Sequence, residues 1–143
     1  MSRIRDIMQD RELFRVEESD TVAQAARRMA ELRVGAILVL NGEELRGLFS
    51  ERDIMTRVVV AQLDPETTPV RVVMTTNLAT IDESTSLEEA MEAMYEHNCR
   101  HLPVLREGKV RCLLSMRDLM NHELARKTEE LHHMRAYING QGI

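Results

Sequence analysis

The sequence repeats itself at an offset of 65 residues, and this duplication constrains the fold more than any other feature. The clearest match aligns Arg46–Asp53 with Arg111–Asp118, because the two segments share Arg, Leu, Ser, Arg and Asp at the same positions. Nearer the amino terminus the register slips by one residue, so that Met8 aligns with Met74. A period of this length is too long for one unit of a solenoid and is typical of a duplicated subdomain.

Each copy predicts the same order of elements: strand, helix, strand, strand, helix. A Ser- and Thr-containing capping segment precedes apolar residues at helical spacing, at Ser19–Thr21 and again at Ser84–Ser86. The next two strands are short, apolar and joined by a Gly-containing turn, at Asn41-Gly42 and Glu107-Gly108. These strands are predicted at residues 36–40 and 45–49 in the first copy, and at 102–105 and 110–114 in the second. Because neither copy can bury both faces of so small a sheet, the sequence predicts an α/β fold in which the copies pack together.

The repeat divides the chain into four parts. We expect the first motif at 1–62, a polar, Pro-containing linker at 63–69, the second motif at 70–122, and a C-terminal helix with its tail at 123–143. The C-terminal helix has apolar residues at seam-like spacing, interrupted at Lys127. They are Met120, Leu124, Leu131, Met134 and Ile138. Two interpretations stay open: a helix that packs on its own module or across a dimer, and a mostly solvated terminal helix.

Composition excludes several classes of function. The net charge is −5 with both signs mixed along the chain, and aromatic residues make up 3% without any Trp, which argues against nucleic acid as a primary partner. No apolar run approaches the roughly 20 residues that span a bilayer, and Met1–Asp10 lacks the apolar core of a signal peptide. We therefore expect a cytoplasmic protein without a membrane partner. The spacing of Cys99, Cys112, His97 and His101 predicts no metal site, and no nucleophile–base motif predicts a catalytic residue.

In order, spacing and duplication, residues 3–122 resemble tandem cystathionine β-synthase (CBS) domain proteins. The motifs that carry this resemblance are Ile7-Met8, Val73-Met74, Thr68-Pro69-Val70, Arg100-His101-Leu102-Pro103-Val104, and the repeated Gly/Cys-x-x-Ser-x-Arg-Asp. The resemblance implies two β-α-β-β-α repeats related by a pseudo-twofold axis, with two clefts between them. It also implies a regulatory module rather than an enzyme, with no obligatory cofactor. Its ligands would be adenosine compounds such as AMP, ADP, ATP, S-adenosylmethionine or NAD-type dinucleotides.

The repeated Ser-x-Arg-Asp motif is the principal candidate for ligand binding. A strand ends and a helix begins at the Ser, so that free backbone N–H groups and the Ser hydroxyl can bind a phosphate oxygen. The Asp, one turn into the helix, can accept two hydrogen bonds from a ribose diol, and the Arg can supply positive charge. The candidate residues are Ser50, Arg52 and Asp53 in the first copy, and Ser115, Arg117 and Asp118 in the second. The alternative is that each Ser only caps its helix and each Asp only complements the helix dipole.

The family resemblance adds further candidates. Basic residues at Arg100 and His101 would reach phosphates across a cleft, whereas the first copy has Val34-Gly35-Ala36 there, which predicts unequal clefts. The segments Arg15-Val16 and Thr80-Ile81 resemble the stretch that holds adenine, although they also fit ordinary strand residues. Cys112 stands where the first copy has Gly47, and we expect its side chain to narrow the second cleft.

The resemblance also predicts how the chain associates. We expect a homodimer with helical contacts, formed by an apolar surface that could alternatively belong to the core. Its residues are Val58, Val59, Val60, Leu63, Met116, Leu119 and Met120. Two functions are therefore in competition: an adenosine-nucleotide sensor that regulates a separate protein, and a ligand-free dimerisation or interaction module.

Overall fold

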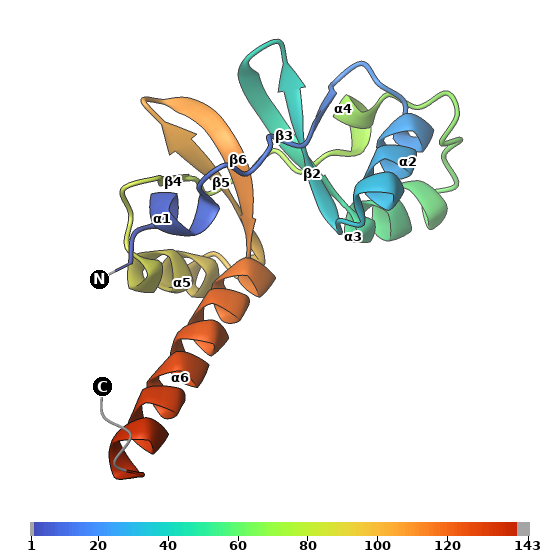
Figure 1. The fold of residues 1–143 in the computed structure, drawn as a ribbon. Helices are drawn as coiled ribbons and strands as arrows, with labels where there is room; N and C mark the ends of the chain where they lie inside the picture. Colours follow the sequence, from blue (N-terminus) through green and yellow to red (C-terminus); the bar gives the residue numbers. More distant parts are fainter. Residues whose placement is uncertain (1, 140–143) are drawn as a thin grey trace.

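The computed structural model describes residues 2–139 and shows two α/β units side by side (Figure 1). Each unit has the predicted strand–helix–strand–strand–helix order, which confirms the α/β fold of two repeats. The first unit contains β1 (Arg15–Glu17), α2 (Val22–Leu32), β2 (Ala36–Asn41), β3 (Glu44–Ser50), α3 (Glu51–Asp53) and the π-helical segment η1 (Ile54–Val59). The second contains β4 (Ile81–Asp82), α5 (Leu87–Glu96), β5 (His101–Arg106), β6 (Lys109–Ser115) and α6 (Met116–Ile138). Two short helices, α1 (Ile4–Met8) and α4 (Val70–Val73), precede the units in sequence.

Each unit has a three-stranded sheet of the same topology. The orders are β1-β2-β3 and β4-β5-β6, with the first pair parallel and the second antiparallel in both sheets. The hairpin turns differ: both Glu107 and Gly108 have positive φ, whereas the first copy turns at Gly42-Glu43 with positive φ at Gly42. The predicted turn at Asn41-Gly42 is therefore one residue early, because Asn41 still pairs with Glu44 in the ladder.

Capping residues begin the first helix of each unit as the sequence predicts. Thr21 Oγ1 accepts the backbone N–H of Gln24 at 3.2 Å, and Ser86 Oγ accepts that of Glu89 at 3.1 Å. The apolar face of each helix then packs on its sheet, so each unit has its own aliphatic core. These cores leave the helix-facing side of each sheet buried and position the Ser-x-Arg-Asp motifs where β3 and β6 end.

The short helices exchange between the units. Ile4 and Met8 of α1 belong to the core of the second unit, and Val70 and Val73 of α4 belong to that of the first. Equivalent backbone bonds hold them: Ile4 N–H donates to Thr85 O at 2.9 Å, and Val70 N–H donates to Asp20 O at 2.7 Å. Figure 1 shows α1 beside α5 and α4 beside α2. The packed units therefore cross the boundaries of the sequence repeats.

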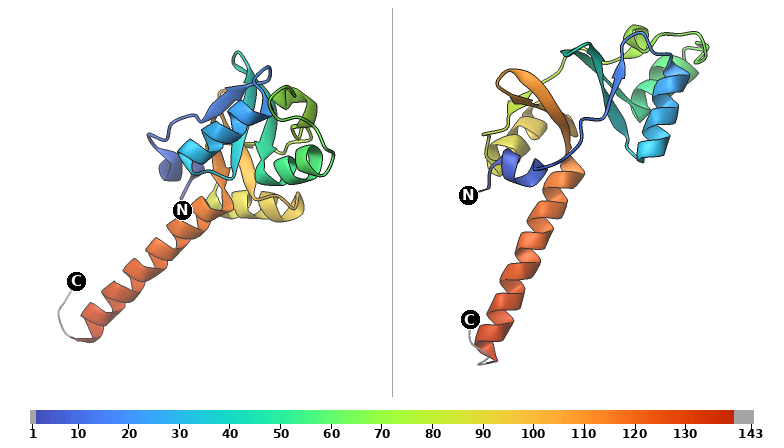
Figure 2. Two further views of the ribbon diagram at one scale, coloured as in Figure 1. Left: turned by 90° about the vertical axis from the view of Figure 1, so that its right-hand side faces the viewer. Right: turned by 45° about the horizontal axis from the view of Figure 1, so that its top comes forward.

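Helix α6 runs without interruption for 23 residues from its cap at Ser115. The second helix of the second copy and the predicted C-terminal helix are thus one element, because no Gly or Pro occurs between Met116 and Ile138. Its first turns pack on the body through the buried Leu119, and the rest extends away from both units in every view (Figure 2). Within residues 2–139, no helix is long and apolar enough to cross a membrane.

Candidate functional site

A cavity of about 450 Å³ lies where the two units meet. Four parts of the chain line it: the segment between α1 and β1, the connection from α2 to β2, the start of β5, and the end of β6 with the first turn of α6. The lining residues are Arg11, Glu12, Phe14, Arg33, Val34, Gly35, Ala36, His101, Leu113, Ser115, Arg117 and Asp118. The cavity therefore brings together four of the predicted site residues, all from the second copy.

Ser115 and Asp118 form a capping box at the amino terminus of α6. The N–H of Ser115 donates to Asp118 Oδ2 at 2.8 Å, and the N–H of Asp118 donates to Ser115 Oγ at 3.1 Å. The hydrogen bonds that the Asp118 carboxylate accepts all end on Oδ2. Its other oxygen, Oδ1, has no hydrogen-bond partner among residues 2–139. The 23-residue helix directs its positive dipole end at this point, which favours an anion, and the N–H of Met116 in its first turn already donates to Arg100 O at 2.8 Å.

Arg11 extends into the same cavity and contacts Asp118. Its guanidinium donates to Asp118 Oδ2 at 2.6 Å and to the carbonyl of Leu113 at 3.4 Å. Burial opposes ionisation of Asp118, but the bonds from Arg11 and Ser115 outweigh burial and hold the pKa of this carboxyl group below its ordinary value. The carboxylate is therefore charged at neutral pH, and the cavity keeps both an anionic and a cationic group.

His101 begins β5, pairs with Ser115 of β6 and lines the cavity, whereas Arg100 is exposed and does not line it. Burial lowers the pKa of His101, and the nearby Arg100 lowers it further, against the opposing charges of Asp118 and Glu51. The imidazole is thus neutral at physiological pH and offers a hydrogen bond instead of a charge. The corresponding residues of the first copy, Val34, Gly35 and Ala36, are uncharged and line the same cavity. The cavity thus contains both the His of the second copy and the uncharged segment of the first.

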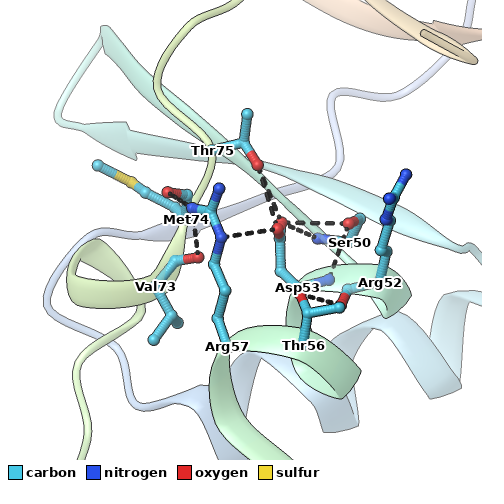
Figure 3. A network of polar contacts seen from close by, with 8 residues as sticks. All are labelled: Ser50, Arg52, Asp53, Thr56, Arg57, Val73, Met74 and Thr75. Carbon is cyan, nitrogen blue, oxygen red and sulfur yellow. Dashed lines mark hydrogen bonds and ion pairs between the residues drawn. The ribbon is translucent and has the colours of Figure 1, made fainter. Parts of the chain in front are cut away.

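The equivalent motif of the first copy has a different environment (Figure 3). Asp53 is 5% exposed, and both of its carboxylate oxygens have partners. Oδ2 accepts the N–H and the hydroxyl of Ser50, and Oδ1 accepts the Thr75 hydroxyl at 3.1 Å and lies 3.7 Å from Arg57 Nε. Arg52 points away from this network. Other residues of the chain therefore already fill the hydrogen-bonding positions of the Asp53 carboxylate.

Gly47 explains how the chain closes around Asp53. Thr75 and Leu48 exchange backbone hydrogen bonds at 2.8 and 2.9 Å, which brings Met74 and Thr75 against β3. A Cβ atom at Gly47 would lie 2.7 Å from Met74 Sδ and 2.8 Å from Thr75 O, so only glycine permits this approach.

The second copy has Cys112 in place of Gly47, and its leading segment does not pair with β6 in this way. The Cys112 side chain is completely buried in the core, where burial raises its pKa to about 11. The segment that contains Arg11 is held instead by the guanidinium of Arg111, which donates to Arg11 O at 2.9 Å. The expectation that Cys112 narrows the cleft is wrong, because the thiol faces the core and the cavity beside this copy is open.

The segments expected to hold adenine lie outside the cavity lining. Val16 and Ile81 are buried in the two cores, and Arg15 and Thr80 are also absent from the lining. The structure instead places Arg11, Glu12 and Phe14, just before β1, along the cavity, together with Arg33. In the sequence, only a basic residue close to an apolar one before β1 could have indicated this part of the cavity. Charged residues occur throughout the first 12 residues, so the pattern does not stand out. In the described part of the chain, no three His, Cys, Asp or Glu side chains gather as metal ligands would.

Comparison with known proteins agrees with this architecture. A sequence profile described as CBS domain matches residues 4–60 and 70–125. The chain belongs to the CBS domain family. A solved structure of a CBS domain protein from Burkholderia ambifaria superposes with a TM-score of 0.82 at 34% identity, and covers 87% of this chain and 95% of that one. The tandem CBS repeats, predicted from the sequence, are confirmed.

Two further CBS relatives are a protein solved with a bound nucleotide and a much longer plant protein. The CBS domain protein PAE2072 from Pyrobaculum aerophilum, solved in complex with AMP, is 28% identical with a TM-score of 0.74, over 82% of this chain and 89% of that one. CBSCBSPB5, a CBS domain-containing protein of Arabidopsis thaliana, is 39% identical over 112 residues, which are 78% of this chain. The chain spans 20% of the length of that plant protein.

Proposed function

We propose that this CBS pair is a regulatory sensor that binds an adenosine nucleotide in the cavity beside Ser115 and Asp118. The observation that carries the proposal is a cavity of about 450 Å³ that combines an ionised Asp, a Ser and the amino terminus of a long helix. Its volume lies within the range of about 300–1,000 Å³ that is typical of small-molecule sites. The complex of AMP with the CBS protein of P. aerophilum supports AMP as the first ligand to test.

Five of the lining residues have a role in this proposal. The phosphate lies at the amino terminus of α6, where Ser115 and Arg117 donate to it, and the ribose hydroxyls donate to Asp118. Arg11 exchanges its bond to Asp118 for the nucleotide phosphate, and His101 donates from the start of β5, beside Ser115. The same residues suit ADP, ATP, NAD-type dinucleotides and S-adenosylmethionine in their shared adenosine part. We propose regulation of a separate protein as the output of this binding.

A thermal-shift screen tests this function. We expect AMP to raise the unfolding temperature of the full chain, because a ligand at 100 times its Kd stabilises the native state by about 2.7 kcal/mol. ADP, ATP, NAD and S-adenosylmethionine are measured in parallel, with adenine-free ribose 5-phosphate as the control. If none of the adenosine compounds shifts the transition, the alternative of a ligand-free interaction module is favoured.

The proposal includes a homodimer formed through helical surfaces of the body. Of the predicted contact residues, Val58 and Leu119 are 2% and 1% exposed and belong to the cores, which corrects that part of the expectation. The others are exposed on η1, just after it, and on the first turns of α6: Val59, Val60, Leu63, Met116 and Met120. Met55 on η1 extends this surface and is 56% exposed. Apolar groups so placed mark an interaction surface that a twofold dimer would bury on both chains.

We expect Val59→Glu to shift the chain from dimer to monomer, because Val59 is 66% exposed at the centre of this surface and a charge there resists burial. Light scattering during size-exclusion chromatography should give about twice the 16.5 kDa monomer mass for the wild type. Glu129→Ala, on an exposed face of α6, serves as the control and should leave the mass unchanged. A wild-type mass near that of the monomer at every concentration would contradict the dimer.

A further inference from the structure

Helix α6 has an apolar stripe that no other part of residues 2–139 covers. Its positions repeat at alternating intervals of four and three residues, which is the heptad spacing of a coiled coil, and every position except Lys127 holds an apolar residue. The apolar side chains are between 56% and 75% exposed. We call the stripe the α6 seam; it consists of Met120, Leu124, Lys127, Leu131, Met134 and Ile138. Most of the stability of helices in proteins comes from packing of their apolar face, so an uncovered seam of this length favours a partner.

The charges beside the seam indicate which partner fits. In heptad terms Leu124, Leu131 and Ile138 occupy the a positions, which places Glu130 at g and Arg135 at the following e position. When two copies of α6 lie parallel and in register, Glu130 of each helix faces Arg135 of the other. An antiparallel pair centred on the seam instead brings Glu130 against Glu130 of the second copy, which is repulsive. Charge complementarity therefore favours a second copy of this chain in parallel orientation.

Lys127 occupies the one charged position of the seam. Its ammonium group lies 4.0 Å from Glu130 of the same helix, so its charge has a partner at the edge of the seam. A long Lys side chain can cover apolar surface with its methylenes and keep the charge in water. A single charged core position costs stability and selects a register. This position thus argues for a short two-stranded coil that is weak when isolated.

The geometry points to a parallel coiled coil between the α6 seams of two copies, and this inference deepens the proposed homodimer. The seam continues directly from Met116 and Met120 of the body surface, so one twofold axis can run through both contacts. In this proposal a change in the relative position of the two units moves the first turn of α6, which contains Asp118. The coiled coil then transmits that movement along α6, away from the two units. The proposed cavity and the proposed coil thus share one helix.

Disulfide trapping tests the coil in the full chain. With Cys99→Ser in every protein to remove the half-buried thiol, Leu124→Cys places a thiol at the seam and Ala125→Cys places one on an exposed face one residue on. We expect oxidised Leu124→Cys to form covalent dimers at least tenfold faster than Ala125→Cys. Equal rates would overturn the coil. A covalent dimer that forms only in a mixture of Leu124→Cys and Met134→Cys chains would overturn the parallel orientation.

A second variant separates the coil from the other proposals. Leu131→Glu should abolish trapping through a cysteine at position 124, whereas Ala125→Glu adds the same charge outside the seam and should leave it unchanged. Circular dichroism checks that both variants keep their fold. The trapping result depends only on contact at α6, so it can fail while AMP still shifts the unfolding temperature or while Val59→Glu still disrupts the body contact. Persistent trapping in Leu131→Glu would contradict the seam.

Discussion

Asp118→Ala should lower the affinity for AMP by about ten- to a hundredfold. The substitution removes a carboxylate that is ionised within the cavity and whose Oδ1 is free to accept from a ribose hydroxyl. A hydrogen bond to a charged group typically contributes about 1.5–3 kcal/mol, and each 1.4 kcal/mol is a factor of ten in Kd. Calorimetric titration of AMP into wild type and variant measures the change, and circular dichroism checks that α6 still forms without its capping partner.

Asp53→Ala is the matched control, since the same motif there is closed by Thr75 and Arg57. We expect its AMP affinity and stoichiometry to equal those of the wild type. Its stability should fall by about 1–3 kcal/mol, because the N–H of Ser50 and the Thr75 hydroxyl lose a buried acceptor. Asp53→Asn keeps the shape if the Ala variant does not fold. Loss of AMP binding in the Asp53 variants alone would move the site to the first copy.

Gly47→Ala is expected to destabilise the fold by about 1–3 kcal/mol, which is the usual cost of overpacking. The added Cβ meets the flexible Met74 side chain at 2.7 Å, but also the backbone oxygen of Thr75 at 2.8 Å. The backbone cannot move without weakening the pair of hydrogen bonds between Leu48 and Thr75. Chemical denaturation monitored by circular dichroism gives the free energy of unfolding for comparison with the wild type.

Gly35→Ala supplies the comparison for Gly47. A Cβ at Gly35 would lie 3.5 Å from the Glu51 carboxylate, which is an ordinary contact. We therefore expect its unfolding free energy to stay within about 0.5 kcal/mol of the wild type. Equal losses in the two variants would show that glycine flexibility, and not the close approach of the Met74–Thr75 segment, explains the effect.

The repeat pattern predicts the fold well because it reflects local chemistry. Thr21 and Ser86 cap helices, and the apolar runs after them form the strands, as their sequences indicate. Periodicity does not say which core a short apolar segment will join. The exchange of α1 and α4 therefore could not be read from Ile4 or Val70, since each would fit either core. The continuity of α6 was visible in the lack of Gly and Pro, but the repeat itself suggested a boundary at 122.

The candidate site was harder to predict because it depends on long-range packing. The segments 50–53 and 115–118 share Ser, Arg and Asp at the same positions and have nearly the same capping geometry. What separates them is a segment more than 20 residues away, where Thr75 reaches one carboxylate and Arg11 reaches the other. Sequence chemistry predicts which side chains can bind a nucleotide, and the approach of these segments decides which of them face a cavity.

The exchange of α1 and α4 has a consequence for the order in which the protein can be made. Helix α1 is synthesised about 80 residues before its backbone partners, Glu83 and Thr85. At about 5–20 residues per second, Ile4 and Met8 wait several seconds without the core that buries them. The first unit can pack on α4 during that time. The second unit can pack on α1 only after its own strands and helices have been synthesised. Helix α1 therefore reaches its packed position only well after it has been synthesised.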